Sequence, residues 1–103
     1  MTRFVQIIEY TTSKPDELSA LSARWRDSRA GDLGGPDRIS VLSDRGHPGR
    51  YLTIAEFDSY ENAMENSGRA DTSDFAAQMA ALCDGPPTFR DLDLVEQWEP
   101  VAH

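Results

Sequence analysis

The feature that most constrains this chain is the order in which its hydrophobic patterns change period. Strand-like patterns occur over residues 4–10, 38–44, 50–57 and 88–98, and helix-like spacing occurs over residues 15–29 and 60–83. This β-α-β-β-α-β order is typical of a ferredoxin-like split βαβ unit. We therefore predict an α+β fold with one antiparallel sheet, strand order 4-1-3-2, and helices on one face.

The helical stretches carry start and stop signals. Ser13 is the expected N-cap of the first stretch and Ser59 that of the second. Gly68 is expected to interrupt the second stretch, and Gly85, followed by two prolines, is expected to end it in a left-handed conformation. The glycines and the proline of residues 31–36 predict a loop.

Length and charge narrow the classes of protein. The 103 residues are enough for one domain, residues 1–103, with a single core, but not for a large internal pocket as well. The net charge of −8 disfavours nucleic acid and anionic membrane as partners. No apolar run is long enough to span a bilayer, the start does not resemble a signal peptide, and a lone Cys83 excludes an internal disulfide. We expect a cytoplasmic protein.

The strands place apolar residues on both of their faces. In the first strand, Phe4, Ile8 and Tyr10 share one face, and Val5 and Ile7 share the other. Because helices cover one face only, a single chain would expose a hydrophobic patch. We predict a twofold homodimer in which two sheets pack into a barrel, with a cavity between them.

A resemblance to a known family rests on residues 44–64, DRGHPGRYLTIAEFDSYENAM. This segment combines a hairpin loop, a strand that ends in a glutamate and an aromatic residue, and an acidic-serine helix cap. It resembles the dimeric α/β-barrel superfamily, and within it the antibiotic-biosynthesis-monooxygenase-like domains. The resemblance implies the fold and the dimer. Its activity is open, since the superfamily hosts oxygenases, isomerases, cyclases, haem enzymes and proteins of no known reaction.

Haem is the cofactor that the resemblance raises first. The haem-degrading branch binds haem through a histidine on the last helix, and Met79 aligns near that position. Asn66 aligns near the aromatic residue that ruffles the haem. Because Met79 shares an apolar stripe with Phe75, core packing is the favoured interpretation and haem is disfavoured. His47 and His103 are the two histidines of the sequence, so no metal site is predicted and no cofactor is expected.

Antiparallel pairing is expected to gather polar and aromatic residues at the two ends of the barrel. One end would hold Glu9, Tyr10, Arg50, Tyr51 and Arg90, with His47 in the nearby hairpin. The other end would hold Gln6, Phe57, Asn62, Asn66 and Trp98. The sequence leaves open which of them face the cavity, and each has a structural or solvated role as its alternative interpretation.

Three functions fit this pattern. The first is a cofactor-independent monooxygenase acting on an electron-rich aromatic or polyketide-like substrate, which supplies its own electrons to dioxygen. The candidates to take the proton are Glu9, Tyr10 and His47, and the candidates to bind substrate are Gln6, Tyr51, Phe57, Asn66, Met79, Arg90 and Trp98. The second function is a non-catalytic dimer that binds a small apolar ligand or serves as an assembly partner. The third is a cofactor-free isomerase or cyclase.

Overall fold

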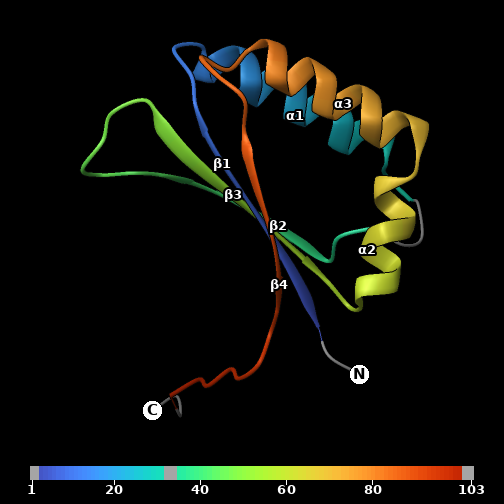
Figure 1. Ribbon diagram of the computed structural model, residues 1–103. Coiled ribbons are helices and arrows are strands. Elements are labelled where there is room, and N and C mark those ends of the chain that lie inside the picture. The colour runs from blue at the N-terminus through green and yellow to red at the C-terminus, as the bar shows by residue number, and fades with distance from the viewer. Residues whose placement is uncertain (1–2, 32–34, 101–103) are drawn as a thin grey trace.

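A computed structural model describes residues 3–31 and 35–100, which form an antiparallel four-stranded sheet with three helices on one face (Figure 1). The elements are β1 (Phe4–Thr11), α1 (Pro15–Ser28), β2 (Arg38–Ser43), β3 (Arg50–Phe57), α2 (Tyr60–Ser67), α3 (Ala70–Ala81) and β4 (Thr88–Asp93). The strand order β2-β3-β1-β4 confirms the predicted ferredoxin-like α+β topology.

The last strand is shorter than predicted. It pairs with β1 until Asp93 lies opposite Phe4, which is the first residue of β1. Leu94 adds one backbone hydrogen bond of 2.9 Å, from its N–H to the carbonyl oxygen of Arg3. Beyond that point β1 offers no partner, so the chain leaves the sheet and runs away from it (Figure 1). The prediction of a strand as far as residue 98 is therefore wrong after Asp93.

The start of α1 is organised by Thr12 and not by Ser13. Lys14 occupies the N-cap position and makes no side-chain cap hydrogen bond. The Thr12 hydroxyl accepts a hydrogen bond of 2.9 Å from the Lys14 N–H and donates one of 2.6 Å to the carbonyl of Leu82. Ser13 instead donates to the carboxylate of Asp84 at 3.3 Å. The predicted Ser13 cap is wrong because Lys14 occupies the N-cap position and the Ser13 hydroxyl is directed to Asp84.

The second helical stretch is divided as predicted. The Ser59 hydroxyl accepts a hydrogen bond from the Asn62 N–H at 3.1 Å, which confirms it as the N-cap of α2. Gly68 forms the C-cap of α2 before α3 begins. Gly85 does not end α3 in a left-handed conformation, because α3 already ends at Ala81 and Gly85 has no positive φ.

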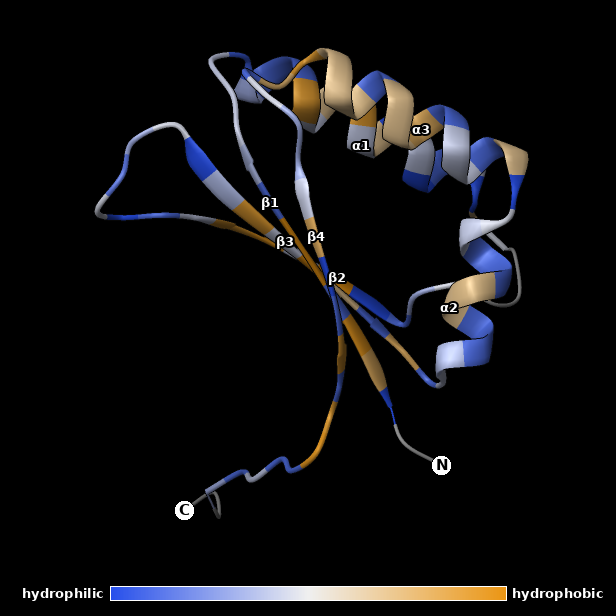
Figure 2. Ribbon diagram, viewed as in Figure 1, coloured by the Kyte–Doolittle hydropathy of each residue, from blue (hydrophilic) through white to orange (hydrophobic). Residues whose placement is uncertain are grey.

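Side chains alternate between the two faces of the sheet. Two buried clusters lie on the helix-covered face, one made of Phe4, Ala55, Phe57 and Ala63 and the other of Tyr10, Leu18, Leu21 and Met79. Figure 2 shows apolar colouring along the middle of the sheet and on parts of the helices. Of the helices within residues 3–31 and 35–100, none is long and apolar enough to cross a membrane.

The opposite face of the sheet is uncovered and rich in aliphatic residues. The register sets Leu42 beside Leu52, Ile54 beside Ile7, and Val5 beside Leu92. All six side chains are exposed or partly exposed in the single chain. The predicted unpartnered apolar face is therefore present, and we call these six residues the uncovered apolar face.

Candidate functional site

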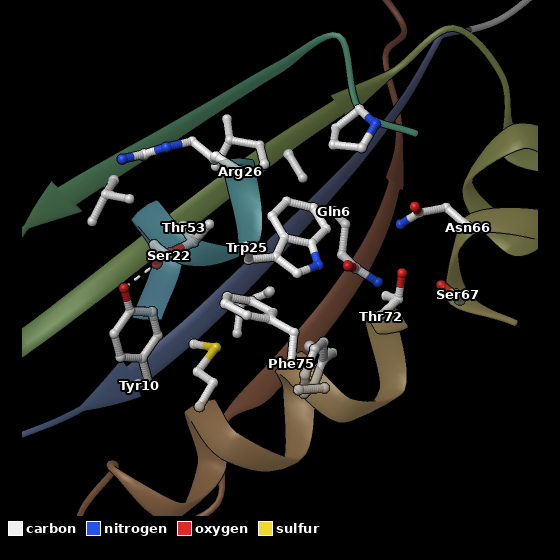
Figure 3. Close-up of a pocket in the computed structure, with 18 of the residues that line it drawn as sticks. Gln6, Tyr10, Ser22, Trp25, Arg26, Thr53, Asn66, Ser67, Thr72 and Phe75 are labelled. Carbon is white, nitrogen blue, oxygen red and sulfur yellow. Dashed lines mark hydrogen bonds between the residues drawn. The ribbon is translucent and has the colours of Figure 1, made fainter. Parts of the chain in front are cut away.

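A cavity of about 300 Å³ lies between the sheet and the helices (Figure 3). Small side chains create it: Thr53 and Ala55 of β3, Ser22 of α1 and Ala76 of α3 all line the wall. Because these side chains are short, the helices and the sheet leave volume between them that the core does not fill. The cavity is small and partly open to the surface, and the residues of one chain form it.

The wall of the cavity is mostly apolar. Trp25 of α1 and Phe75 of α3 pack with ring centroids 5.1 Å apart and ring planes tilted by 32°, and both rings line the cavity. Ile8 of β1 and Met79 of α3 also contribute to the wall. Met79 is buried within the core cluster, as predicted from its place on the apolar stripe. Such a wall suits the flat apolar surface of an aromatic molecule.

Tyr10 is the candidate catalytic residue that lines the cavity. Its hydroxyl forms a hydrogen bond with the Thr53 hydroxyl, the two oxygens lying 3.0 Å apart, and its ring stacks on Tyr51 with centroids 6.0 Å apart. Burial raises the pKa of the Tyr10 phenol, and the hydrogen bond from Thr53 offsets part of that rise. The phenol therefore keeps its proton at neutral pH and is better suited to donate a proton than to remove one.

Glu9 lies on the other side of the sheet. It faces the uncovered surface, where Arg90 donates a hydrogen bond of 3.1 Å to its carboxylate and Arg50 approaches to 3.8 Å. The predicted grouping of residues at this end is present along the strands, but alternation divides it between two faces: Tyr10 and Tyr51 face the helices, and Glu9 and Arg90 do not. Neither Glu9 nor Arg90 lines the cavity.

His47 and Trp98 are likewise away from the cavity. His47 lies in the hairpin loop with 70% of its side chain exposed, 3.2 Å from the carboxylate of Asp44. A hydrogen bond from the Gly46 N–H, assisted by His47 and Arg50, lowers the pKa of Asp44. Trp98 lies in the extended segment after β4 and is 79% exposed. His103 is outside the described residues.

Polar side chains line both ends of the cavity (Figure 3). Tyr10, Ser22 and Thr53 lie at one end, and Gln6, Asn66 and Thr72 lie with Trp25 at the other, which we call the polar end. Asn66 is buried, and its Oδ1 accepts a hydrogen bond of 2.8 Å from Nη2 of Arg29. Of the candidates to bind substrate, Gln6, Phe57, Asn66 and Met79 line the cavity, and Tyr51 packs beside Tyr10 in the neighbouring core.

Sequence reasoning missed Trp25 and Arg29. Trp25 follows Leu18 and Leu21 at helical spacing, and this pattern indicates a core position and nothing more. Arg29 follows it on α1's C-terminal side, where a basic residue is ordinary. The guanidinium of Arg29 lies over the Trp25 ring, 5.0 Å from its centroid, and its side chain is 8% exposed. Only the helix packing brings these two side chains to the polar end.

No metal centre or reactive thiol emerges from the described residues. Within residues 3–31 and 35–100, no group of three or more His, Cys, Asp or Glu side chains is placed to hold a metal ion.

Cys83 is partly buried against the second core cluster. Burial, with a smaller contribution from Asp84, raises the pKa of its thiol, so the thiol form predominates at neutral pH.

The fold is that of antibiotic biosynthesis monooxygenase domain proteins. SnoaB from Streptomyces nogalater, a cofactor-independent oxygenase, matches with a TM-score of 0.79 at 18% identity over 98% of this chain and 100% of that chain. Proteins assigned as antibiotic biosynthesis monooxygenases match from Caulobacter crescentus (TM-score 0.78, 15% identity, 92% of each chain) and from Bordetella bronchiseptica (0.76, 15%, 93% of this chain and 100% of that chain). No family model and no curated protein sequence matches the chain. Identities this low establish the fold alone.

Proposed function

We propose, from this fold and from the cavity inside the chain, that the protein is a cofactor-independent monooxygenase acting on an electron-rich aromatic or polyketide-like molecule. The observation that carries the proposal is a mostly apolar cavity of about 300 Å³ with polar side chains at its two ends. This volume is at the lower end of the range for small-molecule sites, roughly 300–1,000 Å³. SnoaB, which shares the fold, is itself a cofactor-independent oxygenase.

The reaction requires little from the protein beyond a dry and well-shaped site. An activated aromatic CH₂ group loses a proton, and the resulting enolate passes one electron to dioxygen. The two radicals then combine to a peroxide at that carbon, the peroxide takes up a proton, and loss of water leaves a carbonyl group. One oxygen atom ends in the product and the other in water. Apolar walls favour this sequence because they exclude bulk water from the intermediates.

Tyr10 is the residue we assign to proton transfer. It lines the cavity, and burial raises the pKa of its phenol. Its hydroxyl is therefore protonated at neutral pH and can give a proton to the peroxide, with Thr53 able to orient it through their hydrogen bond. In the described part of the wall, no carboxylate or imidazole accompanies it. We infer that the substrate ionises because the site stabilises its anion.

The experiment is an oxygen-consumption assay with a panel of anthrones and hydroquinones, run in air and under argon. Ala76→Phe fills the cavity from α3, whereas Ala77→Phe adds the same ring at the neighbouring exposed position. Ala76→Phe is expected to lower kcat/KM by about tenfold or more, because the substrate loses its space. Ala77→Phe is expected to retain the wild-type rate. Oxygen uptake no faster than without protein, across the panel, would refute the proposal.

The same assay separates the other two functions. The observation that favours a binding protein is the absence of a carboxylate or imidazole from the described part of the wall. Stoichiometric binding of panel members without turnover in air would identify a ligand-binding protein. Product that forms equally well under argon would identify an isomerase or cyclase.

We also propose that the chain works as a homodimer joined through the uncovered apolar face. Contiguous exposed apolar surface of this kind marks an association site. A second copy of the chain carries the same aliphatic surface and can cover this face. An interface formed by the same surface on both partners has twofold symmetry, so assembly stops at a dimer. Charged pairs lie at the margins of this face, with Arg90 and Glu9 3.1 Å apart at one place and Arg38 and Glu56 3.8 Å apart at another.

A further inference from the structure

The polar end of the cavity is held together by one buried guanidinium. Arg29 lies over the Trp25 ring at 5.0 Å from the centroid, and its Nη2 donates a hydrogen bond of 2.8 Å to Asn66 Oδ1. Its Nη1 donates to the Thr72 hydroxyl at 3.2 Å. Trp25 comes from α1, Asn66 from α2 and Thr72 from α3. A single side chain therefore fixes residues from all three helices at the same end of the cavity.

Trp25 presents a hydrogen-bond donor that has no acceptor. Its Nε1 is buried and lacks a hydrogen-bond partner within residues 3–31 and 35–100. An indole N–H can only donate, and native proteins leave few buried donors unsatisfied. Figure 3 shows the nitrogen edge of the ring turned toward the part of the cavity where Gln6, Asn66 and Thr72 gather. The neighbouring Gln6 donates through Nε2 to Asp91 at 3.0 Å, and its Oε1 makes no hydrogen bond with the indole.

Asn66 presents a second donor beside the first. A guanidinium has donors only, so the amide atom that faces Arg29 must be the oxygen. This fixes the orientation of the amide and leaves its Nδ2 group, for which the described residues supply no acceptor, at the wall that Asn66 lines. The hydrogen bond from a cation to Oδ1 also polarises the amide and strengthens the remaining donor.

The described wall contains no carboxylate, and its one charged side chain, Arg26, is exposed. The guanidinium of Arg29 lies over the Trp25 ring and bonds Asn66, and the Asp71 carboxylate lies 3.7 Å from its Nη1. Outside the wall, the Asp91 carboxylate accepts from the Gln6 amide at 3.0 Å. Two N–H groups beside a buried guanidinium in an apolar cavity are an arrangement that stabilises an oxyanion, because the low local dielectric strengthens each interaction.

We propose that Trp25 Nε1 and Asn66 Nδ2 together bind the negatively charged oxygen of an aromatic enolate or phenolate, and that Arg29 is the positioning residue for both. This inference rests on the proposed function and names the group by which the cavity selects its substrate. The ligand binds as its anion, and its proton is released to solvent. The bound anion is the form of the substrate that can transfer an electron to dioxygen.

The probe for the experiment is 4-nitrophenol, whose ionised form absorbs visible light and which does not consume oxygen. Its methyl ether, 4-nitroanisole, has nearly the same shape and cannot ionise. Titrating the bound probe with acid and base measures the pH at which it ionises in the site. We expect that pH to lie below the value for free probe, and the ionised probe to bind at least about tenfold more tightly than the ether.

The decisive variant is Trp25→Phe, which keeps an aromatic ring and removes the N–H. Its affinity for ionised probe is expected to fall about tenfold, while its affinity for 4-nitroanisole stays within about twofold of wild type. The matched control is Trp98→Phe, in the exposed segment after β4, which is expected to behave as wild type. In Trp98→Phe, Trp25 is also the single tryptophan, so quenching of its fluorescence reports a ligand at this end.

Two further variants guard against a folding defect in Trp25→Phe. Asn66→Ser replaces the amide N–H donor with a hydroxyl on a shorter side chain. It is expected to weaken binding of the ionised probe but not of the ether. Arg29→Lys keeps a cation but loses the planar fork, and is expected to raise the ionisation pH of the bound probe without changing ether binding. A merely structural role for Arg29 would weaken both ligands together.

The inference is overturned if wild type binds no ionised probe, or if Trp25→Phe and Asn66→Ser bind it as tightly as wild type does. These outcomes are independent of turnover. Anion-selective binding without oxygen uptake would refute the proposed monooxygenase and leave the oxyanion site standing. Oxygen uptake without anion-selective binding would support the reaction and refute this site.

Discussion

Tyr10 and Cys83 hold their protons more tightly in the folded chain than in the unfolded chain. Burial raises the pKa of each, with Thr53 opposing the effect at Tyr10 and Asp84 adding to it at Cys83. Because both pKa values are raised on folding, their contribution to stability is complete below the unfolded values. It is lost as the pH rises through the folded values. Stability should therefore decline in alkaline solution, first through Cys83 and then through Tyr10.

The test is urea unfolding of wild type, Tyr10→Phe and Cys83→Ala between pH 7 and pH 11. Wild type is expected to lose stability above about pH 9, and each variant should show a shallower decline over its own range. At pH 7, Tyr10→Phe should cost about 1 kcal/mol, because Thr53 loses its hydrogen-bond partner. If both variants lost stability with rising pH as steeply as wild type, the burial of these two groups would be contradicted.

Gly35 has a backbone conformation that favours glycine and little room for a side chain. Its φ is +80°, and a Cβ there would lie 3.1 Å from Nη2 of Arg29 and 3.3 Å from Oδ1 of Asn66. Gly31 has a similar φ of +86° but open space around it. Gly35→Ala is therefore expected to cause both backbone strain and steric overlap of its Cβ with Arg29 and Asn66, whereas Gly31→Ala causes backbone strain alone.

Comparing these two variants by thermal unfolding separates strain from overlap. Gly31→Ala is expected to cost about 1 kcal/mol. Gly35→Ala should cost at least about 1 kcal/mol more, and should also displace the Arg29–Asn66 contact and weaken binding of ionised 4-nitrophenol. Equal losses of stability in the two variants would show that the space beside Gly35 is not filled as described.

At the scale of elements, α2 depends on a single cap. The Ser59 hydroxyl is buried and accepts from the Asn62 N–H. Asn62 in turn bonds both the N–H and the carbonyl of Gly35, at 3.2 and 3.1 Å. The cap therefore secures the helix that carries Asn66 and the loop that packs on it.

Ser59→Ala is expected to lower the free energy of unfolding by about 1 kcal/mol, because α2 loses the acceptor for its first turn. The control is Ser13→Ala, the serine whose position also predicts a cap but whose hydroxyl lies near Asp84 instead. It should cost less than about 0.5 kcal/mol. Urea unfolding at pH 7 measures both, and a larger loss for Ser13→Ala would reverse the assignment of the caps.

At the scale of the whole molecule, the sheet has one face in the core and one apolar face without a cover. Ile54 lies in the middle of the uncovered apolar face, opposite Ile7 on β1. If two copies join there, an arginine at this position must be taken out of water at the contact, which is costly.

Sedimentation at micromolar concentration tests the dimer. Wild type is expected to sediment as a dimer and Ile54→Arg as a monomer. Ala77→Arg places the same charge on the exposed side of α3 and should remain a dimer. A wild type that sediments as a single chain would remove the homodimer from the proposal without affecting the cavity, which the residues of one chain form.

The sequence by itself determined the order of the elements, the strand order of the sheet, the break at Gly68 and the Ser59 cap. These depend on local periods and on short-range capping, which neighbouring residues specify directly. The end of β4 was not determined in this way, because it depends on where β1 begins, which is distant in the chain.

Only the tertiary structure decided where the site lies and which residues form it. Alternation along the strands sends Tyr10 into the cavity and Glu9 to the opposite face, and a period of two cannot say which face the helices cover. The space exists because short side chains from separate elements meet. The donors of Trp25 and Asn66 become a pair because Arg29 contacts both, a relation between helices that no spacing in the sequence records.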